Sequence, residues 1–340
     1  MAYRYLGNKA RLTDWLIDTI SAEVPDGSSI ADPMCGTAAV SEALARAGYQ
    51  VHASDELTFP TMHAAVRLLV PVTPDFETLG GYDDALAALN VAKPVQGYFF
   101  REFSAEGSPE NGCKPRAYFT GENAEKIDAM RARLRHWSAS GKLSVLETDV
   151  LHHDLIMAVN DVANIAGTYG YYRSTWNAQA LQPIRLRRST FDFVGDGHSV
   201  RQGKVEDLAE EIQATSCYLD PPYTKRQYAG NYHLLETLAR GDEPVPVGEG
   251  GLRDWYDNYS DFCSKRFVAA AFQEVVKRLD CEHIFVSYSE DGLLPSDELH
   301  EMLADRGTVT RQTYPLQRYR SNSAGKPGEL SEYLYHLRVS

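Results

Sequence analysis

Short apolar runs that stop abruptly at polar residues recur along this chain. The clearest run is Cys-Tyr-Leu at 217–219, which is followed at once by Asp-Pro-Pro-Tyr at 220–223. An uninterrupted apolar run before a polar break is typical of a buried parallel strand. Two prolines cannot donate hydrogen bonds to a neighbouring strand, so the strand must end before them. Because ligands bind at the carboxyl ends of the strands in an open α/β sheet, we expect a functional site at Asp220 and Tyr223.

The rest of the pattern predicts a doubly wound α/β sheet. Residues 28–56 have the pattern of a strand, a tight loop, a helix and a second strand. Further helices are expected at about 10–23, 122–137, 149–166, 258–279 and 296–305, and further strands at about 283–288, 308–313 and 332–338. Prolines at 71 and 74 end the helix before them, and a mostly helical stretch follows. We therefore expect a Rossmann-like sheet domain made of 1–70 and 196–340, interrupted by a helical insertion at 71–195.

The unit at 28–56 has residues suited to a nucleoside ligand. Gly36 and the small residues after it let a ligand approach the loop and the N-terminus of the helix. Asp55, at the end of the second strand, is placed to accept hydrogen bonds from two ribose hydroxyls. The glycines do not follow Gly-x-Gly-x-x-Gly, which disfavours a dinucleotide, and Asp32 suits a cationic amino-acid end. That combination describes S-adenosylmethionine (SAM), although an ordinary βαβ unit with a helix-capping aspartate fits the same residues.

Asp220 and Tyr223 suit the methylation of a planar amine. The lone pair of an amine on an aromatic base is delocalised, so the amine is a poor nucleophile. Acceptors at Asp220 and at the carbonyl of Pro221, stiffened by Pro222, draw its two N–H groups toward a reactive shape. Tyr223 offers a flat face on which the base stacks. The competing interpretation is a strand that ends in a turn with a capping aspartate, but chance gives this tetrapeptide in roughly one such chain in a thousand.

The composition limits the class of protein. The chain has 340 residues, a net charge of −13 and a pI near 5.3. It shows no apolar core of a signal peptide and no apolar run long enough to span a bilayer, so we expect a cytoplasmic protein without membrane contact. Five cysteines without a Cys-x-x-Cys pair argue against a disulfide framework and a structural zinc site. His152 and His153 are adjacent and do not face one way on a helix, so no metal is expected.

Local positive charge and aromatic residues indicate where nucleic acid would bind. The net negative charge counts against such binding, but a basic run contains Arg185, Arg187 and Arg188. The aromatic segment at 167–176 suits base stacking, although a packed aromatic corner is the favoured interpretation for any single residue in it. The glycine- and proline-rich segment at 241–251 is expected to be a mobile loop over the site. Polar side chains after Tyr223 are candidate contacts to DNA or the target base: Lys225, Arg226, Tyr228, Asn231 and His233.

These motifs, in this order, resemble the alpha class of DNA adenine methyltransferases, which transfer a methyl group from SAM to the exocyclic amine of adenine. The segment Tyr-Leu-Gly-Asn-Lys at 5–9 is similar to the family's N-terminal cofactor motif, and Asp-Pro-Met-Cys-Gly-Thr at 32–37 to its cofactor loop. Asp-Pro-Pro-Tyr at 220–223 is similar to the catalytic motif, and the insertion at 71–195 occupies the place of the target-recognition domain. Ala38 stands where glycine is common, and Met34 where phenylalanine is common.

The resemblance implies roles for individual residues. The implied catalytic residues are Asp220, Pro221, Pro222 and Tyr223. The implied cofactor-binding residues are Tyr5, Gly7, Lys9, Asp32, Pro33, Met34, Cys35, Gly36, Thr37, Asp55 and Glu56. One of Lys204, Glu206 and Asp207 is expected near the adenine of the cofactor.

The sequence therefore predicts an enzyme that methylates N6 of an adenine flipped out of double-stranded DNA, with SAM as its cofactor and no metal. The expected setting is prokaryotic or phage restriction and modification, with a cognate restriction enzyme as a partner and the chain acting as a monomer or dimer. Cytosine N4 or adenine in RNA are alternative targets. A catalytically silent nucleic-acid-binding module is a third alternative, and the intact Asp220 and Tyr223 argue against it.

Overall fold

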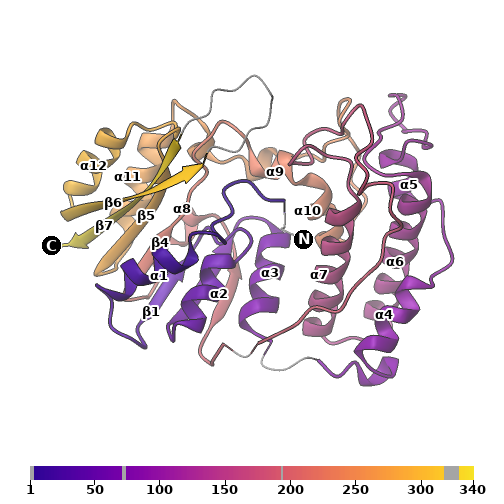
Figure 1. Cartoon of the computed structure of the whole chain (residues 1–340), viewed down its shortest axis with the longest axis horizontal. Coiled ribbons are helices and arrows are strands. Elements are labelled where there is room, and N and C mark those ends of the chain that lie inside the picture. The colour runs from indigo at the N-terminus through magenta and orange to yellow at the C-terminus, as the bar shows by residue number, and fades with distance from the viewer. Residues whose placement is uncertain (1–3, 71–73, 193, 318–328) are drawn as a thin grey trace. The chain divides into compact units, whose positions relative to one another are not determined.

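The structure is a computed structural model that describes residues 4–70, 74–192, 194–317 and 329–340. It divides into two compact units, each made of three chain segments (Figure 1). The sheet unit comprises Asn8–Glu56, Val194–Gln227 and Ser260–Ser340, and the helical unit comprises Met1–Gly7, Leu57–Phe193 and Tyr228–Tyr259. Within the described ranges, no helix is long and apolar enough to cross a membrane.

The sheet unit is built on seven strands in the order β3-β2-β1-β4-β5-β7-β6. The strands are β1 (Ser29–Asp32), β2 (Gln50–Asp55), β3 (Ser199–Gln202), β4 (Ser216–Leu219), β5 (His283–Ser289), β6 (Gly307–Gln317) and β7 (Glu329–Val339). The first five are parallel, and β7 runs antiparallel to both β5 and β6. From β1 the chain adds β2 and β3 on one side, and from β4 it adds β5 on the other side. The order of the strands therefore reverses between the parallel neighbours β1 and β4. This is the expected Rossmann-like doubly wound sheet, and such a reversal point is where ligands bind.

Helices flank the sheet and are themselves part of the sheet unit (Figure 1). They are α1 (Thr13–Ser21), α2 (Ala39–Arg46), α8 (Val205–Leu208), α11 (Val268–Arg278) and α12 (Ser296–Ala304), with short 3-10 turns η2 (Ala209–Glu211) and η4 (Asp261–Cys263). Alternate residues of the central strands, including Cys217 and Ile284, share a buried cluster with Phe272 and Val275 of α11. Because side chains alternate between the two faces of a strand, these residues place one face of the sheet against α11.

The helical unit surrounds a second hydrophobic core. Its elements are α3 (Thr58–Leu68), η1 (Glu77–Leu79), α4 (Tyr82–Asn90), α5 (Tyr98–Phe103), α6 (Gly121–Ala139), α7 (Val145–Val162), α9 (Tyr228–Asn231), α10 (His233–Arg240) and η3 (Tyr256–Asn258). The helix expected at 149–166 begins earlier, because Ser144 and Glu147 form a capping box at the start of α7. That Ser-x-x-Glu spacing is a helix-start signal visible in the sequence.

The helix expected at 258–279 is wrong in its first half, since α11 begins only at Val268. The reason lies at Ser260, whose backbone is bound by the side chain of Gln227. The Ser260 N–H donates to Gln227 Oε1 over 2.9 Å, and the Ser260 carbonyl accepts from Gln227 Nε2 over 3.0 Å. Backbone groups held by a side chain in this way are unavailable to a helix.

The compact units have other boundaries than the domains expected from the sequence. The helical unit begins at Leu57 and takes in 228–259, which the sequence analysis assigned to the sheet domain. The carboxylate of Glu236 on α10 explains part of this, because it accepts hydrogen bonds from the N–H groups of Thr58 and Phe59 at the start of α3. The assignment of target recognition to 71–195 stays a prediction.

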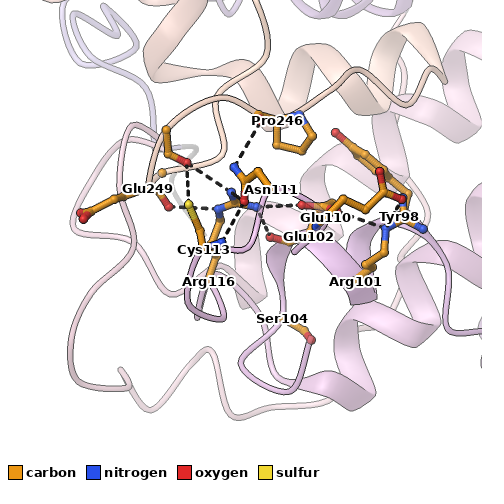
Figure 2. Close-up of polar contacts among 12 residues, drawn as sticks. Tyr98, Arg101, Glu102, Ser104, Glu110, Asn111, Cys113, Arg116, Pro246 and Glu249 are labelled. Atoms are coloured by element: carbon orange, nitrogen blue, oxygen red, sulfur yellow. Dashed lines mark hydrogen bonds and ion pairs between the residues drawn. The ribbon is translucent and has the colours of Figure 1, made fainter. Parts of the chain in front are cut away.

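The segment 241–251, expected to be mobile, is tied down in the helical unit by a buried arginine (Figure 2). Arg116 is fully buried and pairs with the equally buried Glu102 at 2.8 Å. Its Nε donates to the carbonyl of Glu249 and its Nη2 to that of Gly248, over 3.0 and 3.2 Å. Nη2 also donates to Asn111 Oδ1. The two hydrogen bonds to Gly248 and Glu249 fix the backbone of the loop, which argues against mobility.

Candidate active site

Asp220 lies directly beyond β4, at the carboxyl end of the strand, as the sequence predicts. Its Oδ1 is 3.1 Å from the ammonium nitrogen of Lys9. Burial raises the pKa of Asp220 to about 6, against the opposing effect of Lys9. A carboxyl group with this pKa is mostly ionised at neutral pH and is still basic enough to take a proton from a reacting group. Asp220 is therefore suited to accept hydrogen bonds from an amine.

Tyr223 is held by its surroundings before any base arrives. Its ring meets that of Tyr288 on β5 edge to face, with 6.2 Å between the ring centroids. Its carbonyl accepts a 3.0 Å hydrogen bond from the N–H of Leu293. The ammonium of Lys9 lies 5.2 Å from the ring centroid. Pro221 between the two functional residues is buried, so the turn that aims them is packed into the protein.

Lys9 is buried between two carboxylates, and one of them comes from a residue that the sequence analysis missed. Lys9 Nζ donates to Glu332 Oε1 over 2.6 Å, in addition to its pairing with Asp220. Glu332 lies on β7 and also accepts a 2.9 Å hydrogen bond from Ser287 Oγ on β5. Both carboxylates that contact Lys9 belong to the protein, and the role of Lys9 in cofactor binding stays a prediction.

Asp32 ends β1, the strand beside β4, and is almost completely buried. Its Oδ2 accepts a 2.5 Å hydrogen bond from Ser41 Oγ of α2. Its Oδ1 is buried without a hydrogen-bond partner among the described residues. Burial raises the pKa of Asp32 to about 7. An unpaired carboxylate oxygen inside a protein is costly, so this atom suits the ammonium of a ligand.

Asp55 holds the loop that follows Asp32. Asp55 ends β2, and its Oδ2 accepts a 3.0 Å hydrogen bond from the N–H of Gly36. The N–H of Cys35 donates to the carbonyl of Ser54 over 3.0 Å. Gly36 has a φ of 52°, which glycine adopts without strain. The loop is thus tied to the end of β2 by two hydrogen bonds.

The backbone at Ala38 shows why glycine is common at this position in the family that the sequence resembles. It has a φ of 58°, in the left-handed region that L residues avoid. A position with this backbone favours glycine, which is the residue that the family commonly has there. The rest of the loop is buried at Pro33, Cys35 and Thr37 and half-buried at Met34.

The described residues fit SAM as a cofactor. The orphaned oxygen of Asp32 matches the ammonium of its amino-acid end, and Asp55 with the half-buried Glu56 stands at the end of β2 where a ribose is expected. Of the three candidates for the cofactor's adenine, Lys204 precedes α8 and Glu206 lies within it. Burial raises the pKa of Glu206, while Asp207, also in α8, is exposed.

Several predicted residues belong to the helical unit. Tyr5 stacks on Tyr232 at 4.7 Å between ring centroids, and Tyr228 donates its hydroxyl to the carbonyl of Leu6. Gly7 adopts a φ of 72°. The cofactor role of Tyr5 and Gly7 and the DNA role of Tyr228 stay predictions.

His233, a candidate contact to DNA or the target base, has a fully buried side chain in this structure. The ring nitrogen Nε2 bonds to the carbonyl of Tyr169 at 3.0 Å, and burial lowers the pKa of His233 to about 3, so the ring is neutral. Asn231 is half-buried, and its carbonyl accepts from the N–H of Tyr169. Lys225 and Arg226, in the sheet unit, are exposed and available to a ligand.

The basic run at 185–188 is exposed at its arginines, because Ile184 and Leu186 turn inward between them. Arg187 lies 3.7 Å from Asp161, and Arg188 lies 3.1 Å from Asp83. Two of the three predicted phosphate contacts are therefore partly neutralised within the helical unit.

Comparison with known proteins agrees with this geometry. Residues 5–302 match the family described as D12 class N6 adenine-specific DNA methyltransferase. The Type II methyltransferase M.FokI of Planomicrobium okeanokoites is 34% identical over 98% of this chain and 52% of its own length. The Type II methyltransferase M.NlaIII of Neisseria lactamica is 28% identical over 98% of both chains. The modification methylase LlaI of Lactococcus lactis is 30% identical over 96% of this chain and 53% of its own length.

The chain thus spans about half the length of some relatives and nearly all of another. Among solved structures, magnesium protoporphyrin IX methyltransferase from Synechocystis is 9% identical over 97% of this chain and 79% of its own, with a TM-score of 0.35. The sheet order, the acids at the ends of β1, β2 and β4, and the match across 5–302 agree with one another. The chain belongs to the D12 class of N6 adenine-specific DNA methyltransferases, a SAM-dependent family.

Proposed function

We propose that this chain transfers a methyl group from SAM to N6 of an adenine flipped out of double-stranded DNA. The observation that carries the proposal is the pair formed by Asp32 and Asp220. They follow neighbouring parallel strands, one with an unpaired oxygen suited to a cationic ligand and the other in an acceptor motif. Adjacent strands lie about 5 Å apart, so donor and acceptor chemistry meet at the reversal point of the sheet.

When SAM is bound, it supplies a methyl group on a positively charged sulfur. Asp32 would hold its ammonium group and Asp55 its ribose hydroxyls. The Asp220 carboxylate and the carbonyl of Pro221 would accept the two N–H groups of the adenine amine, while Tyr223 stacks on the base. As N6 gains the methyl group it must lose a proton. Asp220, whose pKa is raised to about 6, stands where it can accept that proton and pass it to water.

We further propose that the protein works in the cytoplasm of a bacterium or a phage-infected cell as the modification enzyme of a restriction–modification system. This setting rests on the names of its relatives, which include Type II methyltransferases and modification methylases. The helical insertion at 71–195 would read the DNA sequence, and a cognate restriction enzyme would be its functional partner. The chain would act as a monomer or a dimer.

The test is direct sequencing of modified bases in DNA from a host that has no adenine methylation of its own. We expect N6-methyladenine in one short sequence context with the wild-type chain. Asp220→Ala should produce none while binding SAM normally by calorimetry, because Asp220 acts on the amine and lies outside the proposed cofactor contacts. Modification at cytosine N4 would replace adenine as the target. Absence of any modified base in DNA, with a folded protein that binds SAM, would refute the proposal.

A further inference from the structure

Glu332 takes the shorter of the two contacts that Lys9 makes with carboxylates. Lys9 Nζ is 2.6 Å from Glu332 Oε1 and 3.1 Å from Asp220 Oδ1. Both Lys9 and Glu332 are at least 96% buried, since their side chains are 4% and 3% exposed. Ser287 donates to the same oxygen of Glu332 over 2.9 Å and so fixes its orientation. The Lys9 ammonium is therefore held chiefly by Glu332 on β7, and in that position it contacts Asp220.

The cluster holds two carboxylates and one ammonium, so it has one carboxylate more than a simple ion pair. A single buried Lys–Asp pair would be neutral and would hold Asp220 firmly ionised and weakly basic. A second carboxylate competes for the same ammonium and adds a negative charge beside Asp220. Asp220 then keeps more of its basicity while remaining in place. This matters for an amine acceptor, because a stronger acceptor draws more strongly on the N–H groups.

We propose that Glu332 is a positioning residue for methyl transfer, which shares the Lys9 ammonium with Asp220 and thereby sets the acceptor strength and the orientation of Asp220. The inference rests on the proposed function. It adds a residue from β7 that acts on Asp220 in two ways, by holding the Lys9 ammonium and by its own negative charge.

Titratable groups face Asp220 from several elements. Lys9 comes from the N-terminal loop and Asp32 from β1, Tyr218 and Tyr223 flank Asp220 on its own strand and turn, and Glu332 comes from β7. The two tyrosines have pKa values raised by burial, so they are neutral at working pH. Asp32 is ionised once its cationic ligand is bound. Lys9 and Glu332 are therefore the two charged groups that can be varied without changing a proposed cofactor contact at Asp32 or the charge of SAM.

The test is the pH profile of a single methyl-transfer turnover at saturating SAM, in the full chain, for wild type and Glu332→Gln. Asp220 must be ionised to accept, so the wild-type rate should rise with pH through about 6. Glu332→Gln removes the competing charge, so this rise should move to lower pH by about one unit. The plateau rate should fall about threefold, if about half of the lost basicity appears in the rate. A profile that superimposes on the wild type would overturn the inference.

Three further variants separate this role from a structural one. Lys9→Met should move the rise to higher pH, the opposite direction, because the ammonium lowers the pKa of Asp220. Glu332→Asp keeps the charge but shortens its reach, so it should lower the rate and leave the rise near its wild-type pH. Ser287→Ala changes no charge, so the rate should again rise near the wild-type pH. If Glu332→Gln does not fold, a shifted profile in Glu332→Asp would overturn the inference. Wild-type protein that binds SAM and methylates no adenine would instead refute the proposed function.

Discussion

Asn in place of Asp32 is the change that tests the cofactor site most sharply. Asparagine keeps the size of the side chain and its ability to accept a hydrogen bond from Ser41, but it removes the negative charge. We expect Asp32→Asn to weaken binding of SAM and of S-adenosylhomocysteine, since both carry the ammonium that would meet the orphaned Oδ1 of Asp32. Methylthioadenosine has the same nucleoside without the amino-acid end, so its binding should be unchanged.

The magnitude follows from one charge-assisted hydrogen bond in a buried place. Such a bond contributes about 1.5–3 kcal/mol, which corresponds to a loss of roughly 10- to 150-fold in affinity. A pH dependence should accompany it. Burial raises the pKa of Asp32 from 3.8 to about 7, so below that pH the wild-type carboxyl is protonated and cannot pair with the ammonium. Wild-type affinity for S-adenosylhomocysteine should therefore fall by up to about tenfold per pH unit below 7, and the variant should show no such slope.

The raised pKa also makes a prediction for the ligand-free protein. The folded state holds a proton on Asp32 that the unfolded state releases between pH 3.8 and about 7, so stability declines as pH rises through this window. Asp32→Asn lacks this decline and should melt at a higher temperature than wild type at pH 8.

Calorimetric titrations with S-adenosylhomocysteine and methylthioadenosine between pH 6 and 8 measure both effects. Equal losses for the two ligands would show that Asp32 supports the loop and does not contact the amino-acid end. Unchanged affinity for both would place the ammonium elsewhere and refute the reasoning.

Other predictions concern the expected ribose contact, the buried Arg116–Glu102 pair and the expected DNA surface. Asp55→Ala should weaken SAM binding more than it lowers turnover at saturation, because a ribose contact is equal in ground and transition states; unchanged affinity in calorimetry would contradict this. Arg116→Met should cost about 3–5 kcal/mol of stability and lower the melting temperature by roughly 4–7 °C, with partial recovery on adding Glu102→Gln; an unchanged melting temperature would refute a stabilising role for the buried Arg116–Glu102 pair. Neutralising the arginines at 185–188 should weaken binding to all DNA sequences and flatten the salt dependence by about one unit of slope per lost phosphate contact, whereas Arg46→Ala should not. An unchanged slope would remove this run from the DNA interface.

The strand ends were predictable because local pattern specifies them. A short apolar run followed by Asp-Pro-Pro-Tyr has one simple structural interpretation, and Asp32 and Asp55 follow from the same rule at two other strands. Ala38 was predicted to stand at a glycine position, and its positive φ gives the physical reason. These features depend on residues a few positions apart.

The remaining parts depend on contacts between distant residues. Nothing near Arg116 in the sequence shows that its guanidinium is fully buried against Glu102 and the backbone of 248–249. The sequence gives only a weak indication that Glu332 is buried, because it lies two residues from Leu334, on the same face of β7. A charged residue in that register requires a buried partner, but periodicity alone does not identify it as Lys9.

The Lys9–Glu332 contact also has a consequence for the order of events during synthesis of the chain. The two residues are 323 positions apart, so closing the contact between them costs about 5 kcal/mol of chain entropy that only the finished sheet repays. A growing chain on the ribosome already contains Asp220 and its prolines, but β7 has not yet been made. Until that strand emerges, Lys9 has a single carboxylate partner and the edge of β5 is uncovered. Translation therefore places the strand that supplies the second carboxylate after every other strand of the sheet, and a chain that stops short of it would carry the motif without the tuned acceptor.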